Sequence, residues 1–248
     1  MKQLRAPAIF GLLLMCTVAC KFGSSSSTIS NDNTANSTNT NDKRSVTTTS
    51  QAEPTNIVGK YNITGTNPNG AVYKGTLEVL SRGDVYQFRW NAGAQYDGVG
   101  VQNGNVVAVA FANGSNGQGC GVVDYSIKSG GELDGKWGYW GTDESGTERA
   151  TRKSGSGLEG DYDGAGKNPN GKEYKVSISV QPAGNLYHFA WSNKTEGLGI
   201  KQGDNVAVGI GGTRCGFVAY EIRSDGTLEG IWGGYGSDKT GTEKATRQ

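Results

Sequence analysis

The feature that most constrains the fold of this chain is an internal repeat that covers most of its length. Residues 131–150 recur as residues 226–245, so that Trp137 corresponds to Trp232 and Glu148 to Glu243. The correspondence extends over 57–153 and 158–248, with gaps at 91–97 and 113–119. Such a unit is far longer than a solenoid repeat and is large enough to be a small domain. We therefore expect two domains, 57–153 and 158–248, each able to fold alone, with Ser-Gly-Ser-Gly at 154–157 as a flexible linker.

Within each copy, short runs of alternating apolar and polar residues lie between glycine-rich turns. Tyr86, Phe88 and Trp90 alternate in this way, and 187–191 repeats the pattern. This period of two predicts β-strands. In the first copy we expect about eight, near 57–64, 72–80, 85–91, 96–101, 105–111, 120–127, 132–138 and 146–152.

Strands joined by such short turns pair as antiparallel neighbours. Closing the sheet on itself gives its apolar face a partner surface and removes both edges. We therefore predict an all-β protein with two tandem small antiparallel barrels of about eight strands each. Two β-sandwiches are the alternative.

The framework shared by the two copies reads G-x-Y, N-P-N-G-x-x-Y, Y-x-F-x-W, G-x-G, C-G, Y-x-I, G-x-L-x-G-x-W and G-T-E in chain order. Over 57–248 it resembles a small Gly/aromatic-rich β domain of exported bacterial lipoproteins, mostly uncharacterised, some of which carry a fibronectin-binding label. The resemblance implies export and says little about activity. In outline, the predicted barrel is also similar to avidin- and lipocalin-like proteins, whose mouths hold small ligands.

The N-terminal twenty residues predict a lipoprotein signal peptide. Lys2 and Arg5 form a basic start, and 8–18 is an apolar segment too short to span a bilayer. Residues 17–20, Thr-Val-Ala-Cys, resemble the bacterial lipobox. By that resemblance Cys20 carries the lipid, and Lys21 after it implies the outer membrane. We expect an exported protein that is lipid-anchored to the bacterial membrane.

Residues 21–56 are rich in Ser, Thr and Asn and hold few apolar side chains. Such a segment cannot bury enough surface to offset its ordering entropy, so we expect a disordered tether. The formal net charge of +1, without a basic block, argues against nucleic acid as a partner.

The aromatic residues that recur in both copies are the candidate ligand-binding residues. They are Tyr61, Tyr86, Trp90, Tyr125 and Trp137 in the first copy, and Tyr162, Tyr187, Trp191, Tyr220 and Trp232 in the second. Rings and hydroxyls of this kind suit a small, partly apolar ligand. The simpler interpretation is that the rings fill the barrels. We therefore predict no pocket of ~300 Å³ or more, the size that a drug-sized ligand needs.

Signals for catalysis are weak. Glu148 and Glu243 could do acid–base work, but both lie on strands rich in Arg and Lys, and so do Asp134 and Glu229. Cross-strand ion pairs are the expected role for all four. His188 is the chain's only histidine and has no counterpart in the first copy, so a triad or zinc site in each copy is excluded. We expect no enzyme, metal or cofactor, with an uncharacterised hydrolase as the weakest alternative.

Two cysteines, Cys120 and Cys215, occupy equivalent positions in the two copies. A disulfide between them needs Cα atoms within ~7 Å, which two independent barrels seldom provide. We predict that both are unpaired and buried.

The predicted function is a lipid-anchored envelope or surface module that binds a macromolecule without catalysis, with duplication raising avidity. The alternative is a small-ligand carrier with one calycin-like pocket per barrel. A void inside a barrel favours the carrier, whereas a solid core with an exposed aromatic patch favours the interaction module.

Overall fold

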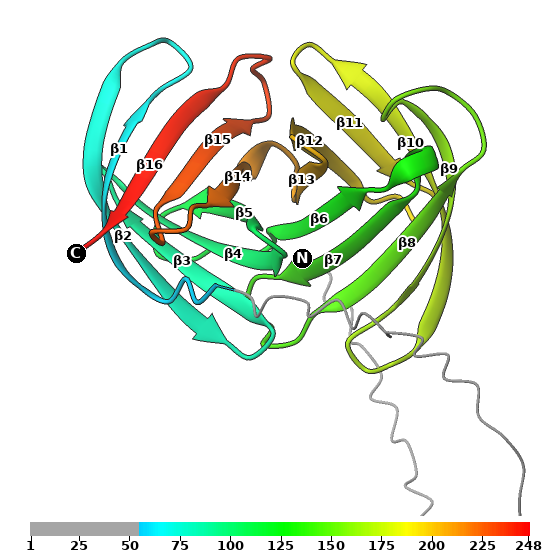
Figure 1. The fold of residues 1–248 in the computed structure, drawn as a ribbon, viewed down its shortest axis with the longest axis horizontal. Helices are drawn as coiled ribbons and strands as arrows, with labels where there is room; N and C mark the ends of the chain where they lie inside the picture. Colours follow the sequence, from blue (N-terminus) through cyan, green and yellow to red (C-terminus); the bar gives the residue numbers. More distant parts are fainter. Residues whose placement is uncertain (1–54) are drawn as a thin grey trace, which may run out of the picture. The chain divides into compact units, whose positions relative to one another are not determined.

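The computed structural model describes residues 55–248, which form two closed, eight-stranded antiparallel barrels (Figure 1). The predicted fold class is confirmed. The expected signal peptide, the lipidated Cys20 and the tether up to residue 54 lie outside the described residues. Within the described part, no helix is long and apolar enough to cross a membrane.

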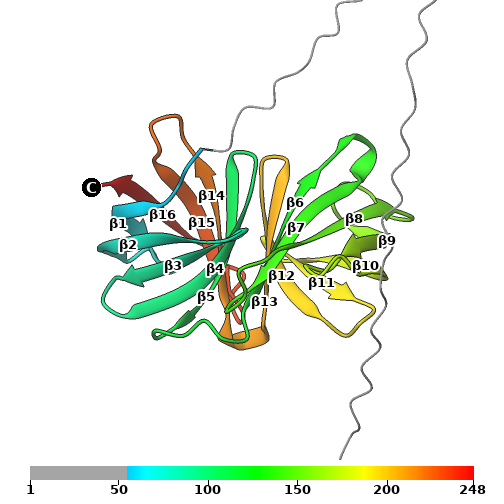
Figure 2. The same ribbon diagram turned by 90° about the horizontal axis from the view of Figure 1, so that it is seen from below.

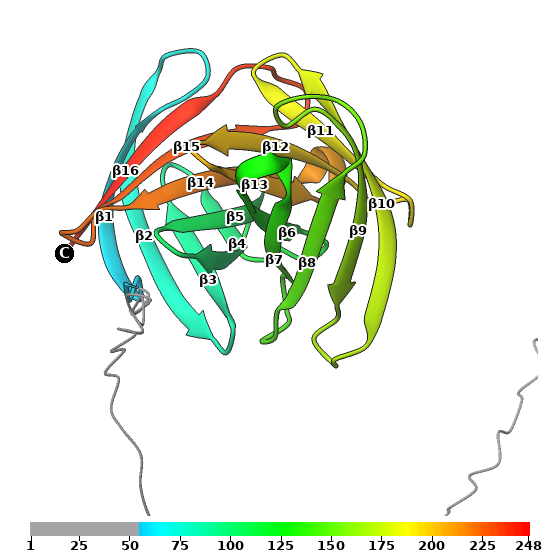
Figure 3. The same cartoon turned by 45° about the vertical axis from the view of Figure 1, so that its right-hand side comes forward.

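We name the two barrels A and B. The strands of barrel A are β1 (Gly59–Thr66), β2 (Val72–Arg82), β3 (Val85–Asn91), β4 (Gln95–Asn103), β5 (Val106–Asn113), β14 (Gly216–Ile222), β15 (Leu228–Gly234) and β16 (Gly241–Arg247). The strands of barrel B are β6 (Gly121–Ile127), β7 (Leu133–Tyr139), β8 (Gly146–Arg152), β9 (Gly160–Lys167), β10 (Glu173–Ala183), β11 (Leu186–Trp191), β12 (Glu196–Gln202) and β13 (Asn205–Ile210). Figure 3 shows β6 to β10 side by side in the wall of barrel B.

The boundary between the repeats is not the boundary between the barrels. Barrel B is one contiguous segment, β6 to β13, whereas barrel A joins β1–β5 to β14–β16 from the other end of the chain. Each barrel therefore combines the first five strands of one copy with the last three of the other. This differs from the expected arrangement of one barrel for each copy.

The exchange takes place at the two segments that follow β5 and β13. β5 pairs with β14 (Phe111 opposite Gly216) in place of β6, and β13 pairs with β6 (Ile210 opposite Gly121) in the same register. Because the two copies share one pattern, the last three strands of either copy fit the same edges. This is domain swapping within one chain, and the segments 114–120 and 211–215 carry the chain across.

The Ser-Gly-Ser-Gly segment at 154–157 is a turn and does not link two domains. It connects β8 to β9, which pair antiparallel inside barrel B (Thr151 opposite Asp163). Here the expectation of an interdomain linker was wrong, because the repeat ends within a barrel wall.

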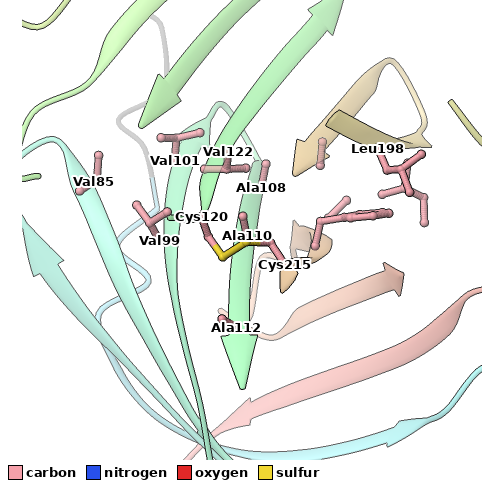
Figure 4. Packing of buried hydrophobic residues seen from close by; sticks show 14 of the residues in the cluster. Val85, Val99, Val101, Ala108, Ala110, Ala112, Cys120, Val122, Leu198 and Cys215 are labelled. Carbon is pink, nitrogen blue, oxygen red and sulfur yellow. A yellow bond between two sulfur atoms is a disulfide. The ribbon is translucent and has the colours of Figure 1, made fainter. Parts of the chain in front are cut away.

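A disulfide joins Cys120 to Cys215, with Cα atoms 5.8 Å apart (Figure 4). The prediction that both cysteines are unpaired was wrong. The two barrels are not independent, and each cysteine lies at the end of a crossing segment, where the swap brings the two equivalent positions together. An oxidising compartment permits such a bond.

The disulfide is part of a buried cluster between the barrels. Strands β4 and β5 of barrel A lie beside β6 and β13 of barrel B (Figure 2). Small side chains on β5, Ala108 and Ala110, allow close approach, and Val122, Leu198 and Phe217 fill the remaining space. A single apolar core therefore holds the two barrels against each other.

Each barrel also has its own interior core. Phe88, Val107 and Leu77 are buried in barrel A, and Phe189 and Val206 hold the equivalent positions in barrel B. The predicted inward face of the aromatic strands is confirmed. Alternation along the strands, which sets every second side chain inside, is the physical reason.

Candidate functional site

A buried carboxylate lies inside each barrel near one end. In barrel A, Glu243 on β16 accepts hydrogen bonds from Tyr73 Oη (2.8 Å), Trp90 Nε1 (3.0 Å) and Tyr220 Oη. Its side chain is nearly shielded from solvent, with only 6% of the residue exposed. Three neutral donors thus satisfy a carboxylate that would otherwise be costly to bury.

Barrel B repeats this arrangement with equivalent residues. Glu148 on β8 accepts from Tyr174 Oη (2.9 Å), Trp191 Nε1 (3.0 Å) and Tyr125 Oη. Trp137 Nε1 donates in turn to Tyr174 Oη at 3.0 Å. Because of the swap, each set combines residues of both copies. In barrel B, Tyr174 and Trp191 come from the second copy, whereas Tyr125 and Glu148 come from the first.

The alternation of β8 and β16 explains why these glutamates point inward. Gly146, Glu148 and Ala150 alternate with exposed residues and are buried. The expectation that Glu148 and Glu243 form cross-strand ion pairs was therefore wrong. The small residues two positions away from each glutamate were the signal in the sequence, since side chains two apart share a face.

The other pair of acids does form ion pairs. Arg149 Nη2 lies 3.5 Å from Asp134 Oδ2, and Lys244 Nζ lies 3.0 Å from Glu229 Oε1 on the outer surface. For Asp134 and Glu229 the predicted role is confirmed.

Burial controls the protonation of the cluster in barrel A. Desolvation raises the pKa of Glu243, although the hydrogen bonds from Tyr220, Trp90 and Tyr73 oppose this rise. Burial and the neighbouring carboxylate both raise the pKa of Tyr220 and of Tyr73. Both phenols therefore remain protonated donors around neutral pH.

A cavity of about 320 Å³ opens at the end of barrel A where Glu243 lies. The prediction that no pocket of this size exists was therefore wrong for barrel A. Half of its lining residues are aromatic, and the short loop between β3 and β4 adds small residues. They are formed by Asn67, Tyr73, Trp90, Ala92, Gly93, Ala94, Tyr96, Phe111, Val218, Tyr220, Trp232 and Glu243.

The two barrels differ in the strand that supplies the ring over the first glycine of β14 and of β6. Gly234 on β15 stands opposite Gly216, whereas the equivalent position in barrel B is Tyr139, opposite Gly121. The Tyr139 ring packs edge-on against Trp137, with ring centroids 5.8 Å apart. In barrel A the Phe111 ring, from the neighbouring strand β5, covers Gly216 in the place that the Tyr139 ring takes over Gly121 in barrel B.

The structure brings together some of the predicted ligand-binding residues. Trp90, Tyr220 and Trp232 line the cavity of barrel A, and Trp191, Tyr125 and Trp137 are their counterparts in barrel B.

The remaining four predicted residues lie elsewhere. Tyr61 and Tyr162 donate to the carbonyls of Ile57 (2.7 Å) and Leu158 (2.8 Å), which precede β1 and β9. Tyr86 donates to Gln102 Oε1 at 3.1 Å, at the other end of β3 from Trp90, and Tyr187 is its counterpart on β11.

Sequence reasoning missed Tyr73, Tyr96, Phe111 and Glu243 as lining residues. Tyr73 recurs as Tyr174, so repetition together with the alternation of side chains along the strand is sufficient to find it. Tyr96 and Phe111 have no aromatic counterparts and gave no repeat signal.

His188 Nε2 lies 3.6 Å from Glu196 Oε2, and both side chains are partly exposed. Residues 55–248 contain no group of three or more His, Cys, Asp or Glu side chains that could hold a metal ion.

Comparisons with known proteins add no assignment to this geometry. No protein-family model matches the chain, and neither a curated protein nor a solved structure matches it significantly.

Proposed function

We propose that this protein is a non-catalytic carrier of a small ligand, which binds at the mouth of barrel A. The observation that carries the proposal is the cavity of about 320 Å³ with aromatic walls and a buried carboxylate. Ligand pockets are typically mainly apolar, with a few polar groups that fix orientation, and have volumes of about 300–1,000 Å³. The cavity lies at the lower limit of this range, so it suits one small molecule.

The distribution of exposed apolar side chains supports a carrier more than a macromolecule-binding module. Among the described residues, the exposed large hydrophobic side chains are Val72 (71%) and Tyr139 (36%), one on each barrel. A docking surface for a protein partner usually presents a larger continuous apolar patch.

Two substitutions at equivalent positions test the carrier proposal. Gly234→Tyr adds to barrel A the ring that barrel B has at Tyr139, beside Phe111 of the cavity wall, and the nearest atom to an added Cβ, Gly216 Cα, is 3.8 Å away. The variant should fold but lose binding of a neutral fluorescent probe such as N-phenyl-1-naphthylamine. Tyr139→Gly is the matched control, which leaves barrel A unchanged and should bind at least as well as the wild type.

Equal probe binding by wild type and Gly234→Tyr would exclude the cavity of barrel A as the site. An absence of binding by the wild type across a set of small neutral and charged molecules would reject the carrier proposal and favour a macromolecular partner.

We also propose that the carrier is exported and anchored through a lipid on Cys20, as 17–20 suggests. Cys20→Ser should release the protein from membrane fractions and abolish incorporation of labelled fatty acid. A variant that remains in the membrane and still carries acyl chains would contradict the lipobox interpretation.

A further inference from the structure

We infer that the ligand of barrel A is an organic cation, a small ammonium compound with an apolar body. This inference rests on the proposed carrier function and names the chemical class of its ligand. Three features of the cavity carry it: the sign of its charge, the arrangement of its rings and its difference from barrel B.

Glu243 is the only acidic side chain among the residues that line the cavity, and none of them is Lys or Arg. Its hydrogen bonds come from two phenols and an indole, which are neutral donors. These donors satisfy the oxygens but do not cancel the negative charge. An anionic ligand would be repelled in this low-dielectric site, whereas a cation would gain Coulomb energy.

The aromatic walls add a second attraction for positive charge. Trp90 and Phe111 have ring centroids 5.3 Å apart, and Tyr96 meets Phe111 edge-on at 5.8 Å. Tyr73 and Trp232 form a further edge-on pair at 6.5 Å. Ring faces attract cations through their quadrupoles, and groups of rings are the usual receptors for quaternary ammonium groups. Rings without a nearby carboxylate would suit a neutral ligand equally well.

The comparison with barrel B separates a ligand site from a structural cluster. Barrel B has the same carboxylate and donors at Glu148, Tyr125, Tyr174 and Trp191. It has Thr195 and Ile210 at the positions of Tyr96 and Phe111. The carboxylate cluster therefore has a role in both barrels, whereas the additional rings belong to barrel A alone.

The test compares three molecules of similar shape and different charge: choline, its neutral isostere 3,3-dimethyl-1-butanol, and the anion 3,3-dimethylbutanoate. Binding is measured by calorimetry and by the fluorescence of the tryptophans. Choline should bind the wild type about tenfold or more tightly than the neutral isostere, and the anion should show no binding. Gly234→Tyr should abolish the binding of choline.

Glu243→Gln removes the charge and keeps the size of the side chain. It should weaken choline binding about tenfold and leave the affinity for the neutral probe N-phenyl-1-naphthylamine within about twofold. Retained probe binding also shows that the variant is folded. Glu148→Gln is the matched control, because it makes the same change in barrel B and should not alter choline binding.

The outcomes distinguish failure of the cation inference from failure of the carrier proposal. If the three isosteres bind equally while Gly234→Tyr blocks them, the cation inference is overturned and the carrier function stands. If choline binding is unaffected by Glu243→Gln but lost in Glu148→Gln, the site lies in barrel B. If neither choline nor any neutral probe binds, both proposals fail. Should Glu243→Gln not fold, the charge comparison in the wild type still decides.

Discussion

Glu148 and Glu243 are each surrounded by two tyrosines and one tryptophan, all of which donate hydrogen bonds to the carboxylate. The donors come from three strands that do not pair with the strand of the carboxylate, so each carboxylate ties its strand to others across the barrel interior. Removing one donor therefore costs both packing and a hydrogen bond to a buried charged group.

Trp191→Ala should lower the free energy of unfolding by ~3–5 kcal/mol, because the indole is buried, stacks on Phe189 and donates to Glu148. Urea denaturation followed by circular dichroism measures the change. Tyr187→Phe, on the same strand but outside the cluster, is the control and should stay within about 1 kcal/mol. A nearly neutral Trp191→Ala would mean that the carboxylate cluster contributes little to stability.

Asp124 on β6 is a buried acid outside these clusters. Its Oδ1 accepts from Asn205 Nδ2 at 3.3 Å, and its Oδ2 has no hydrogen-bond partner. Burial raises its pKa from 3.8 to about 7, although the bond from Asn205 opposes the rise. The equivalent residue in the second copy is Ala219.

This raised pKa has a defined effect on stability. Between about pH 4 and about pH 7 the unfolded chain loses the Asp124 proton while the folded protein keeps it, so stability should fall as the pH rises through this window. Asp124→Asn removes the titrating group and should flatten this part of the profile, with a gain on the order of a few kcal/mol at neutral pH. Denaturant midpoints at several pH values measure it. Parallel profiles for variant and wild type would show that Asp124 titrates normally.

At the scale of strands, the two crossing segments are the elements that decide the topology. Residues 114–120 connect β5 to β6, and residues 211–215 connect β13 to β14. The disulfide between Cys120 and Cys215 joins the ends of the two segments. The bond closes a loop with a sequence separation of 95 that contains all eight strands of barrel B, so it restricts the unfolded chain strongly.

Cys120→Ser should therefore lower the free energy of unfolding by ~2–5 kcal/mol. The wild type in a reducing agent should show the same loss, and the variant should be insensitive to reductant. Because the apolar cluster between the barrels remains, the variant should still fold at low temperature. Equal stability of the oxidised wild type and the variant would show that the core between the barrels suffices.

The strands themselves were predictable because their pattern is local. Tyr86, Phe88 and Trp90 reveal their common face by alternation alone, and the turn glycines mark the ends of the strands. The swap was not predictable, because β5 can pair with β6 or with β14 in the same register. Equivalent copies make these pairings nearly indistinguishable in sequence. The lining of the cavity escaped prediction because part of it depends on single differences between the copies, such as Phe111 against Ile210.

For the whole molecule, the topology makes barrel B a contiguous insertion into barrel A. All residues of the barrel B core, from Val123 to Val208, lie within 121–210. By contrast, the first repeat, 57–153, contains five strands of one barrel and three of the other. The segment that closes a barrel alone, 121–210, is therefore shifted along the sequence relative to the repeated segments, 57–153 and 158–248.

A fragment of residues 121–211 should therefore fold alone, whereas the fragment 57–153 should not fold as a monomer. The first keeps every strand pair of barrel B, and about 90 residues can hold a sufficient core. It exposes Val122, Leu198 and Ile200 from the core between the barrels, so weak self-association is expected. The second leaves two open sheets, which two molecules can close by exchanging their last three strands. Amide dispersion in NMR spectra tests folding, and light scattering after size exclusion gives the mass. A monomeric 57–153 with one cooperative transition, beside an unfolded 121–211, would mean that each copy prefers to close on itself and that the swapped pairing is wrong.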